Sequence, residues 1–171
     1  MPAPAGRSAA IADIVEDRPT GVDWHSPQET ARLLGMMTDV HKAKVAAARA
    51  TGSRAVGTIY KRTRPDARGE RRQRAEVRFD GVAGCLRTPV GGSSRQTIIV
   101  VEGARVRTRL LSPREAARLM GLDDDFWLPD HYNSAYHVAG DGLAVPVVRH
   151  LADHLLEPLA DAAGGAVEAV A

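Results

Sequence analysis

The sequence predicts an α+β fold, with short antiparallel strands in the middle of the chain and helices at both ends. Serine-led helix-capping patterns occur near both ends, at Ser26 and Ser112. Between residues 54 and 111, short runs rich in Val, Ile and Thr alternate with glycine-containing turns. Of the 171 residues, 44% are hydrophobic, which is enough to bury one modest core with a smaller satellite.

The best-defined element is a helix expected at residues 112–121. Ser112 is a favourable N-cap, and Glu115, three residues later, can complete a capping box. Pro113 falls at the first helical position, where its missing N–H costs nothing. Gly121 can end the helix in the left-handed conformation. We therefore expect this helix to form early and to brace its neighbours.

The N-terminal part divides into a tail and a helical scaffold. Residues 1–10 are small and include two prolines, so we expect a disordered tail. Residues 11–52 are expected to be helical scaffold. One helix begins at Ser26, where the Ser-Pro-x-Glu pattern recurs, and a second follows Thr38 and ends near Gly52.

The middle of the chain, residues 53–111, is expected to be a basic, β-rich region. Residues 54–109 contain 14 lysines or arginines against 5 aspartates or glutamates, a local balance of +9 within a net charge of +2. Such a concentration of positive charge is typical of a surface that follows a phosphate backbone. A solvated arginine-rich face would give the same composition.

Strands and turns are expected within this region as follows. Predicted strands span residues 55–60, 75–79, 82–87, 96–102 and 105–111. The second and third are joined by a tight turn at Asp80 and Gly81, and the last two by a turn at Gly103. Residues 61–74 carry many cations and few apolar anchors, so we expect a loop that becomes ordered only against an anion such as DNA.

Alternation along the last predicted strand suggests a further anion-binding feature. Arg105, Arg107 and Arg109 are two residues apart, so they share one strand face. We expect a row of guanidinium groups suited to phosphates.

Three segments, in order, resemble the DNA (cytosine-5) methyltransferase family. Residues 109–126, with the run Ser112 to Gly121, resemble the ninth sequence block of that family. Residues 135–146, AYHVAGDGLAVP, are similar to the tenth block, and residues 81–96 are similar to the target-recognition segment. The resemblance implies that residues 112–158 form a helical segment that completes a methyltransferase domain, followed by a disordered tail at 159–171.

The resemblance also implies site residues, a cofactor and a partner. The partner is double-stranded DNA, and the cofactor is S-adenosylmethionine. Asp141 and Gly142 match cofactor-contacting positions, although the family usually has asparagine in place of Asp141. The expected DNA-binding residues are Arg87, Thr88, Gly91, Gly92, Ser93, Ser94, Arg95 and Gln96. The Gly-Gly-Ser-Ser run alone would equally suit a simple turn between strands.

The catalytic motifs of the family are absent from this sequence. There is no Pro-Cys pair, no Phe-x-Gly-x-Gly run and no Glu-Asn-Val run. The family reaction flips a cytosine out of the duplex, attacks C6 with a thiolate and methylates C5. We therefore expect that this chain resembles the C-terminal half, contributes no catalytic residue and is inactive without a separately encoded catalytic half.

The remaining candidate site residues have plainer explanations. Cys85, the only cysteine, is expected in mid-strand with a structural role, and a reactive thiol is the less favoured alternative. His150 and His154 have zinc-ligand spacing without an evident third ligand, which favours surface histidines. Val147, Val148, Leu151 and Leu155 form an apolar stripe on a helix expected at residues 143–156, ended by Pro158.

Three functions remain open from the sequence. The first is the recognition half of a methyltransferase, with two alternatives: a standalone DNA-binding module or inactive remnant, and an α+β domain without a nucleic-acid partner. No apolar run approaches the length of a membrane span, so we expect no membrane partner and a cytoplasmic location.

Overall fold

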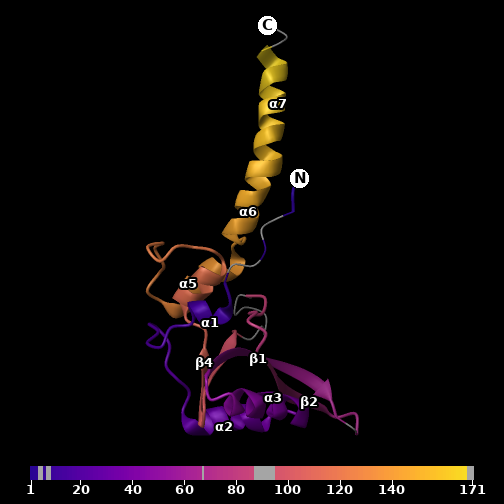
Figure 1. Cartoon of the computed structure of the whole chain (residues 1–171). Coiled ribbons are helices and arrows are strands. Elements are labelled where there is room, and N and C mark those ends of the chain that lie inside the picture. Colours follow the sequence, from indigo (N-terminus) through magenta and orange to yellow (C-terminus); the bar gives the residue numbers. More distant parts are fainter. Residues whose placement is uncertain (4–5, 7–8, 67, 87–94, 169–171) are drawn as a thin grey trace.

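The computed structural model describes residues 1–3, 6, 9–66, 68–86 and 95–168. Helices and a four-stranded antiparallel sheet give the predicted α+β fold (Figure 1). In chain order the elements are α1 Ile11–Ile14, α2 Pro27–Gly35, α3 Asp39–Ala50, β1 Arg54–Pro65, β2 Arg71–Arg78, β3 Thr97–Glu102, β4 Arg105–Leu110, α4 Pro113–Leu119, α5 Tyr132–Asp141, α6 Val145–Leu151, the π-helical turn η2 Ala152–Leu156 and α7 Glu157–Glu168.

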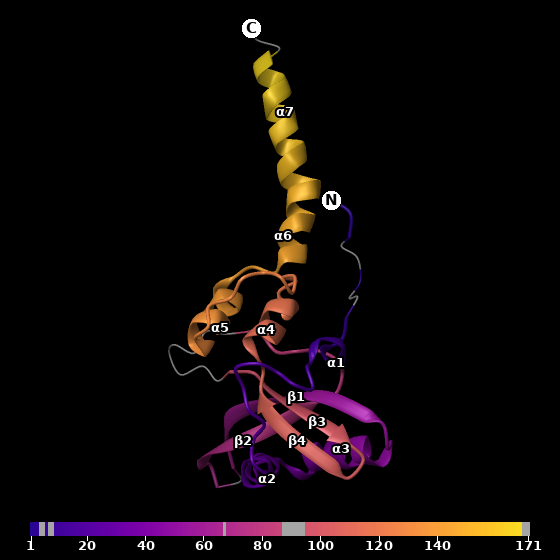
Figure 2. The same cartoon turned by 90° about the vertical axis from the view of Figure 1, so that its left-hand side faces the viewer.

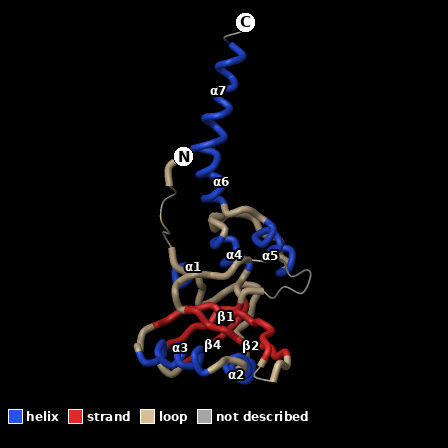
Figure 3. The backbone as a smooth tube through the Cα atoms, turned by 90° about the vertical axis from the view of Figure 1, so that its right-hand side faces the viewer, coloured by secondary structure: helices blue, strands red, loops and turns tan. Residues whose placement is uncertain are grey.

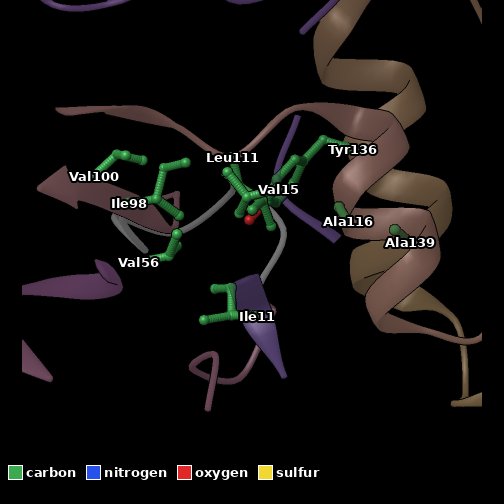
Figure 4. Close-up of a cluster of buried hydrophobic side chains, with 9 residues drawn as sticks. All are labelled: Ile11, Val15, Val56, Ile98, Val100, Leu111, Ala116, Tyr136 and Ala139. Carbon is green, nitrogen blue, oxygen red and sulfur yellow. The ribbon is translucent and has the colours of Figure 1, made fainter. Parts of the chain in front are cut away.

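The sheet separates two hydrophobic clusters. Its strand order is β2-β1-β3-β4, with α2 and α3 on one face and α1, α4 and α5 on the other (Figure 3). Side chains alternate along β3, because Ile98 and Val100 belong to the cluster on the α4 side and Ile99 and Val101 to the cluster under α3. Tyr136 of α5 closes the first of these clusters (Figure 4). β3 is therefore buried on both faces and forms the centre of the fold.

The predicted helix starts are confirmed at both serines. The side chains of Ser26 and Ser112 each accept a hydrogen bond from the N–H three residues later, and the glutamate at that position bonds back to the serine N–H. Gly121 has φ +78°, as expected for a residue that ends a helix in the left-handed region. The α3 helix follows Thr38, but that side chain makes no capping hydrogen bond.

The predicted polar loop at residues 61–74 is wrong, because β1 and β2 extend into it. Their pairing continues from Thr58↔Arg78 to Pro65↔Arg71. At the turn, the Asp66 carboxylate accepts the backbone N–H groups of Arg68 and Glu70. The segment thus obtains its backbone hydrogen bonds from a hairpin and needs no anion to become ordered.

The predicted strand at residues 82–87 is also absent from the described part of that segment. After the turn at Gly81 (φ +73°), the chain makes contacts with side chains instead of a strand ladder. The Thr58 hydroxyl donates to the carbonyl of Val82, and the N–H of Gly84 donates to Oε1 of Gln96. Cys85 consequently lies in an exposed loop rather than in mid-strand.

The C-terminal helices form one rod that projects away from the sheet (Figures 1 and 2). This rod passes Pro158 and continues to Glu168, beyond the predicted end. In the π-helical turn, the N–H of Glu157 donates to the carbonyl of Ala152, five residues back. The wider turn immediately precedes Pro158, where it can accommodate the proline ring and the missing donor.

Candidate nucleic-acid interface

Most of the expected DNA-binding residues lie outside the described residues. This group comprises Arg87, Thr88, Gly91, Gly92, Ser93 and Ser94. The described residues on either side, up to Leu86 and from Arg95, show how the ends of this segment are held. We call residues 85–95 the recognition segment.

Gln96 closes the base of the recognition segment from inside the protein. It is buried, with 7% of its surface exposed. Its Oε1 accepts the N–H of Gly84 at 3.0 Å, and its Nε2 donates to the carbonyl of Thr97 at 3.0 Å. A third hydrogen bond runs from Nε2 to the carbonyl of Ile59. Gln96 is among the expected DNA-binding residues, and in this structure its side chain points into the protein.

Arg95 ties the other end of the recognition segment to α5. Its Nη2 donates to Oδ1 of Asn133, and its guanidinium carbon lies 5.1 Å from the ring centroid of Tyr132. Burial raises the pKa of the Tyr132 phenol, whose hydroxyl donates to the carbonyl of Leu111. The Arg95 Nε is buried and has no hydrogen-bond partner among the described residues. No sequence pattern indicates this link between Arg95 and α5, because the two hydrogen-bonded residues are 38 positions apart.

The two expected cofactor residues lie at the junction of α5 and α6. Asp141 is the last residue of α5 and is exposed, and Gly142 follows as its C-cap. Gly142 lines an open groove of about 740 Å³ together with Gly140, Pro146 and the loop around Cys85. A Cβ atom at Gly142 would lie 3.0 Å from the carbonyl oxygen of Val138, so a larger residue would crowd this junction.

The expected row of phosphate-binding arginines on β4 is wrong at two of its three positions. Arg109 is fully buried and makes a bidentate ion pair with Glu115, with distances of 2.7 and 2.6 Å. Arg107 lies over the Trp24 ring at 4.1 Å and donates to Glu102 at 3.2 Å. Arg105 is the exposed member. Trp24 and α4 cover this sheet face at Arg107 and Arg109, so these two arginines serve packing and pairing.

The exposed arginines are concentrated instead on the β1–β2 hairpin. Arg62 and Arg64 on β1 have about half of their side-chain surface exposed, and Arg72 on β2 has 60% exposed. Register pairs Arg62 with Arg74 and Arg64 with Arg72 directly across the two strands. The alternation of Arg62, Arg64, Arg72 and Arg74 in the sequence is the signal that could have indicated strands here.

The lesser candidate sites have limited chemistry. The Cys85 thiol is exposed and donates to the carbonyl of Leu86 at 3.4 Å. His150 and His154 stack with their ring centroids 4.6 Å apart. Across the residues that the structure describes, no group of three or more His, Cys, Asp or Glu side chains could hold a metal ion.

The α6–α7 rod exposes a series of apolar side chains. Its exposed members are Val147, Val148, Leu151, Leu155, Leu156 and Leu159, and Leu143 precedes them. We name this surface the apolar rod face. Within the described ranges, no helix has both the length and the apolar character to cross a bilayer.

Comparison with known proteins identifies the family. The family model for C-5 cytosine-specific DNA methylases matches residues 3–157. Type II methyltransferase M1.ScrFI of Lactococcus lactis subsp. cremoris is 38% identical over 61 residues, which cover 36% of this chain and 16% of the relative. Type II methyltransferase M.HpaII of Haemophilus parainfluenzae is 32% identical over 95 residues, which cover 47% of this chain and 26% of the relative.

The chain therefore spans only a small part of the length of these relatives, and no solved structure matches it. The family match, however, extends over most of the chain and includes the sheet, α4, and α5 with Gly142 after it. The chain belongs to the C-5 cytosine-specific DNA methylase family.

Proposed function

We propose that this chain is the target-recognition portion of a DNA (cytosine-5-) methyltransferase. It binds double-stranded DNA through the recognition segment and supplies one wall of an S-adenosylmethionine site. The nucleophile and the glycine-rich cofactor loop come from polypeptide outside these 171 residues. The observation that carries the proposal is the apolar rod face, where a helix within the family match exposes Val147, Leu151 and Leu155.

This exposure is what a part of a larger domain would show. Three leucines of this face, Leu155, Leu156 and Leu159, are 43%, 58% and 59% exposed. Burying a leucine fully stabilises a protein by about 1.5–3 kcal/mol, so a row of exposed leucines favours a covering partner. A catalytic half that packs along the rod would provide that cover.

The support at both ends of the recognition segment favours a role in DNA choice. Its ends are held by Gln96 inside the sheet and by Arg95 against α5. This support leaves the side chains of residues 87–94 as the ones proposed to address base edges and phosphates, with the glycines allowing close approach. We therefore assign Arg95 and Gln96 to positioning the segment.

The cofactor-side residues suit the chemistry of S-adenosylmethionine. The exposed Asp141 carboxylate can accept hydrogen bonds from hydroxyl or amino groups of the cofactor. Gly140 and Gly142 line the groove at the α5–α6 junction. When bound, the cofactor supplies the methyl group, whereas this chain orients it and closes one side of the pocket.

The test is methyl transfer from labelled S-adenosylmethionine to duplex DNA, with and without an added catalytic half. The added polypeptide must carry the Pro-Cys pair and the glycine-rich loop of the family. We expect no transfer by this chain alone and transfer by the mixture. Transfer by the chain alone would overturn the assignment of the nucleophile to another polypeptide. DNA binding without transfer in the mixture would favour a standalone DNA-binding module.

A further inference from the structure

The β1–β2 hairpin extends beyond the rest of the sheet as a two-stranded ribbon. Pairing of β1 with β3 ends at Ile59↔Thr97, whereas pairing with β2 continues to Pro65↔Arg71. Apart from an isolated bridge between Ala75 and Met37, residues 60–65 and 71–76 therefore have no third strand beside them (Figure 1). We call residues 60–65 and 71–76 the basic ribbon. At about 3.4 Å per residue, the basic ribbon is roughly 20 Å long.

The basic ribbon and its turn carry a strong positive charge. Residues 60–76 contain seven cationic and three acidic side chains. The cationic side chains are Lys61, Arg62, Arg64, Arg68, Arg71, Arg72 and Arg74. Register places four of the arginines on one face, as the directly opposed pairs Arg62↔Arg74 and Arg64↔Arg72. Like charges directly opposite each other destabilise a hairpin, which favours a bound anion on that face.

Acidic side chains hold several of these arginines in place without neutralising the ribbon. Glu76 lies 3.5 Å from Arg62 and 3.3 Å from Arg64. Asp66 lies 3.0 Å from Arg72. Such contacts restrict the arginine rotamers while half or more of each guanidinium side chain stays exposed. The ordering entropy of binding an external anion is correspondingly reduced.

The basic face continues toward the base of the recognition segment. Tyr60 shares its strand face with Arg62, whose guanidinium carbon lies 5.9 Å from the tyrosine ring centroid. A Cβ atom built on Gly84 would lie 2.5 Å from the Tyr60 ring, so that ring packs directly on the chain just before the segment. One surface therefore runs from the chain at Gly84 onto the basic ribbon.

We propose that the basic ribbon is a second DNA-contact element, which binds the phosphate backbone and groove wall of B-form duplex DNA beside the target site. This inference deepens the proposed function, on which its choice of DNA as the partner rests. The major groove, about 12 Å wide, admits a two-stranded β-ribbon. Arginines on a ribbon contact phosphates without reading sequence, so this element supplies affinity and leaves base choice to the recognition segment.

The experiment measures binding of the whole chain to a fluorescently labelled 20-base-pair duplex by anisotropy, at several salt concentrations. One variant is Arg62→Gln/Arg64→Gln, and a second is Arg62→Lys/Arg64→Lys. The matched control is Lys42→Gln/Lys44→Gln on α3, which covers the opposite sheet face. Like the ribbon variant, this control removes two positive charges. It also removes one surface ion pair, between Lys42 and Asp39 at 3.8 Å.

We expect the glutamine variant of the ribbon to bind the duplex about tenfold more weakly. The slope of its log binding constant against log salt concentration should decrease by the amount that corresponds to about two lost phosphate contacts. The lysine variant should retain most of the affinity, because phosphate contacts need charge more than geometry. The control should bind like the unsubstituted chain. Circular dichroism spectra and melting temperatures of all variants establish that they are folded.

Equal losses in the ribbon and control variants would show that only net charge matters and would overturn the proposal. The same conclusion follows if the glutamine variant binds unchanged, if the chain does not bind the duplex, or if it prefers duplex RNA, whose major groove is too narrow for a ribbon. Methyl transfer in the mixture described above is a separate measurement. Transfer in the mixture together with unchanged binding of the glutamine variant would overturn the ribbon proposal alone. Absence of duplex binding would count against both proposals.

Discussion

Arg109 and Glu115 form an ion pair in which both side chains are completely enclosed, with distances of 2.7 and 2.6 Å between guanidinium nitrogens and carboxylate oxygens. The same carboxylate accepts the backbone N–H of Ser112 at 2.7 Å and that of Glu16 at 2.6 Å. Arg109 in turn donates to the carbonyl of Glu16. One buried pair therefore joins β4, the helix α4 that begins after Ser112, and the N-terminal segment.

Breaking the ion pair between Arg109 and Glu115 should lower the stability of the folded chain. We expect Arg109→Met or Glu115→Gln alone to lower the free energy of unfolding by about 3–5 kcal/mol, because each leaves one buried group without its partner. The Arg109→Met/Glu115→Gln double variant should lose less than the sum of the single losses. Urea unfolding followed by circular dichroism measures all three.

The surface ion pair between Arg118 and Asp124 is the control for these substitutions of the buried pair. Their shortest distance is also 2.6 Å, but Asp124 has 66% of its side chain exposed. Asp124→Asn should lower the free energy of unfolding by less than about 1 kcal/mol. Similar losses for Asp124→Asn and Glu115→Gln would contradict the importance given to burial.

Stability should fall in acid through Glu115. Burial raises the pKa of this carboxyl, but hydrogen bonds from Arg109, Ser112 and Glu16 lower it by more, so its pKa is below the ordinary value. A carboxyl with a depressed pKa contributes stability above the unfolded pKa of about 4.3, and that stability is lost as the pH falls through the folded pKa.

Unfolding free energies measured from pH 7 down to pH 3 test this dependence. Glu115→Gln should be less stable at neutral pH and should lose less stability below about pH 4.3 than the unsubstituted chain. Asp125→Asn, at an exposed position, is the control and should keep the full acid loss. A parallel acid loss in Glu115→Gln would assign the effect to other carboxyls.

Gly57 should tolerate no side chain, because β1 approaches the end of β2 closely there. A Cβ atom at Gly57 would lie 2.3 Å from the carbonyl oxygen of Arg78 and 2.7 Å from the Phe79 ring. We expect Gly57→Ala to lower the free energy of unfolding by about 1–3 kcal/mol through overpacking. Since the clash falls at the root of the basic ribbon, DNA binding should weaken as well.

Gly35→Ala is the matched control for this substitution. No described atom lies within 4 Å of a Cβ at Gly35, the last residue of α2. Alanine is a better helix former than glycine, so this variant should be unchanged or more stable by up to about 1 kcal/mol. Equal melting temperatures for the two variants would show that β1 and β2 can separate at no cost.

The apolar rod face should matter for association and not for folding of this chain. Leu155→Gln/Leu159→Gln should change the free energy of unfolding by no more than about 0.5 kcal/mol, because both side chains are already exposed. Binding to the catalytic half, measured by calorimetry, should weaken at least about tenfold, since two leucines lose their burial.

The exposed carboxylate of Asp153, on the same rod, supplies the control Asp153→Asn, which should leave this association unchanged. Unaltered binding of Leu155→Gln/Leu159→Gln would place the catalytic half on another surface. A large loss of stability in that variant would mean that the rod packs on this chain in solution.

The sequence alone determined the features that depend on near neighbours. Both capping boxes involve residues three positions apart, so Ser26 and Ser112 mark their helices without help from the rest of the fold. The hairpin across Gly103 likewise joins adjacent strands. Family membership followed from the order of three short motifs, which the family match over residues 3–157 supports.

Only the tertiary structure decided which charges are buried and which are free. The alternating pattern of its strand predicts a surface position for Arg109. In the structure this arginine is buried and donates to the carbonyl of Glu16, 93 residues away in the sequence. Gln96 is typical of a recognition side chain from its sequence context, and the fold buries it where its Oε1 accepts the N–H of Gly84. Local hydrogen bonds need few chain torsions to be ordered, so residue type predicts them. Burial depends on segments far apart in sequence, whose approach is stabilised by the whole core.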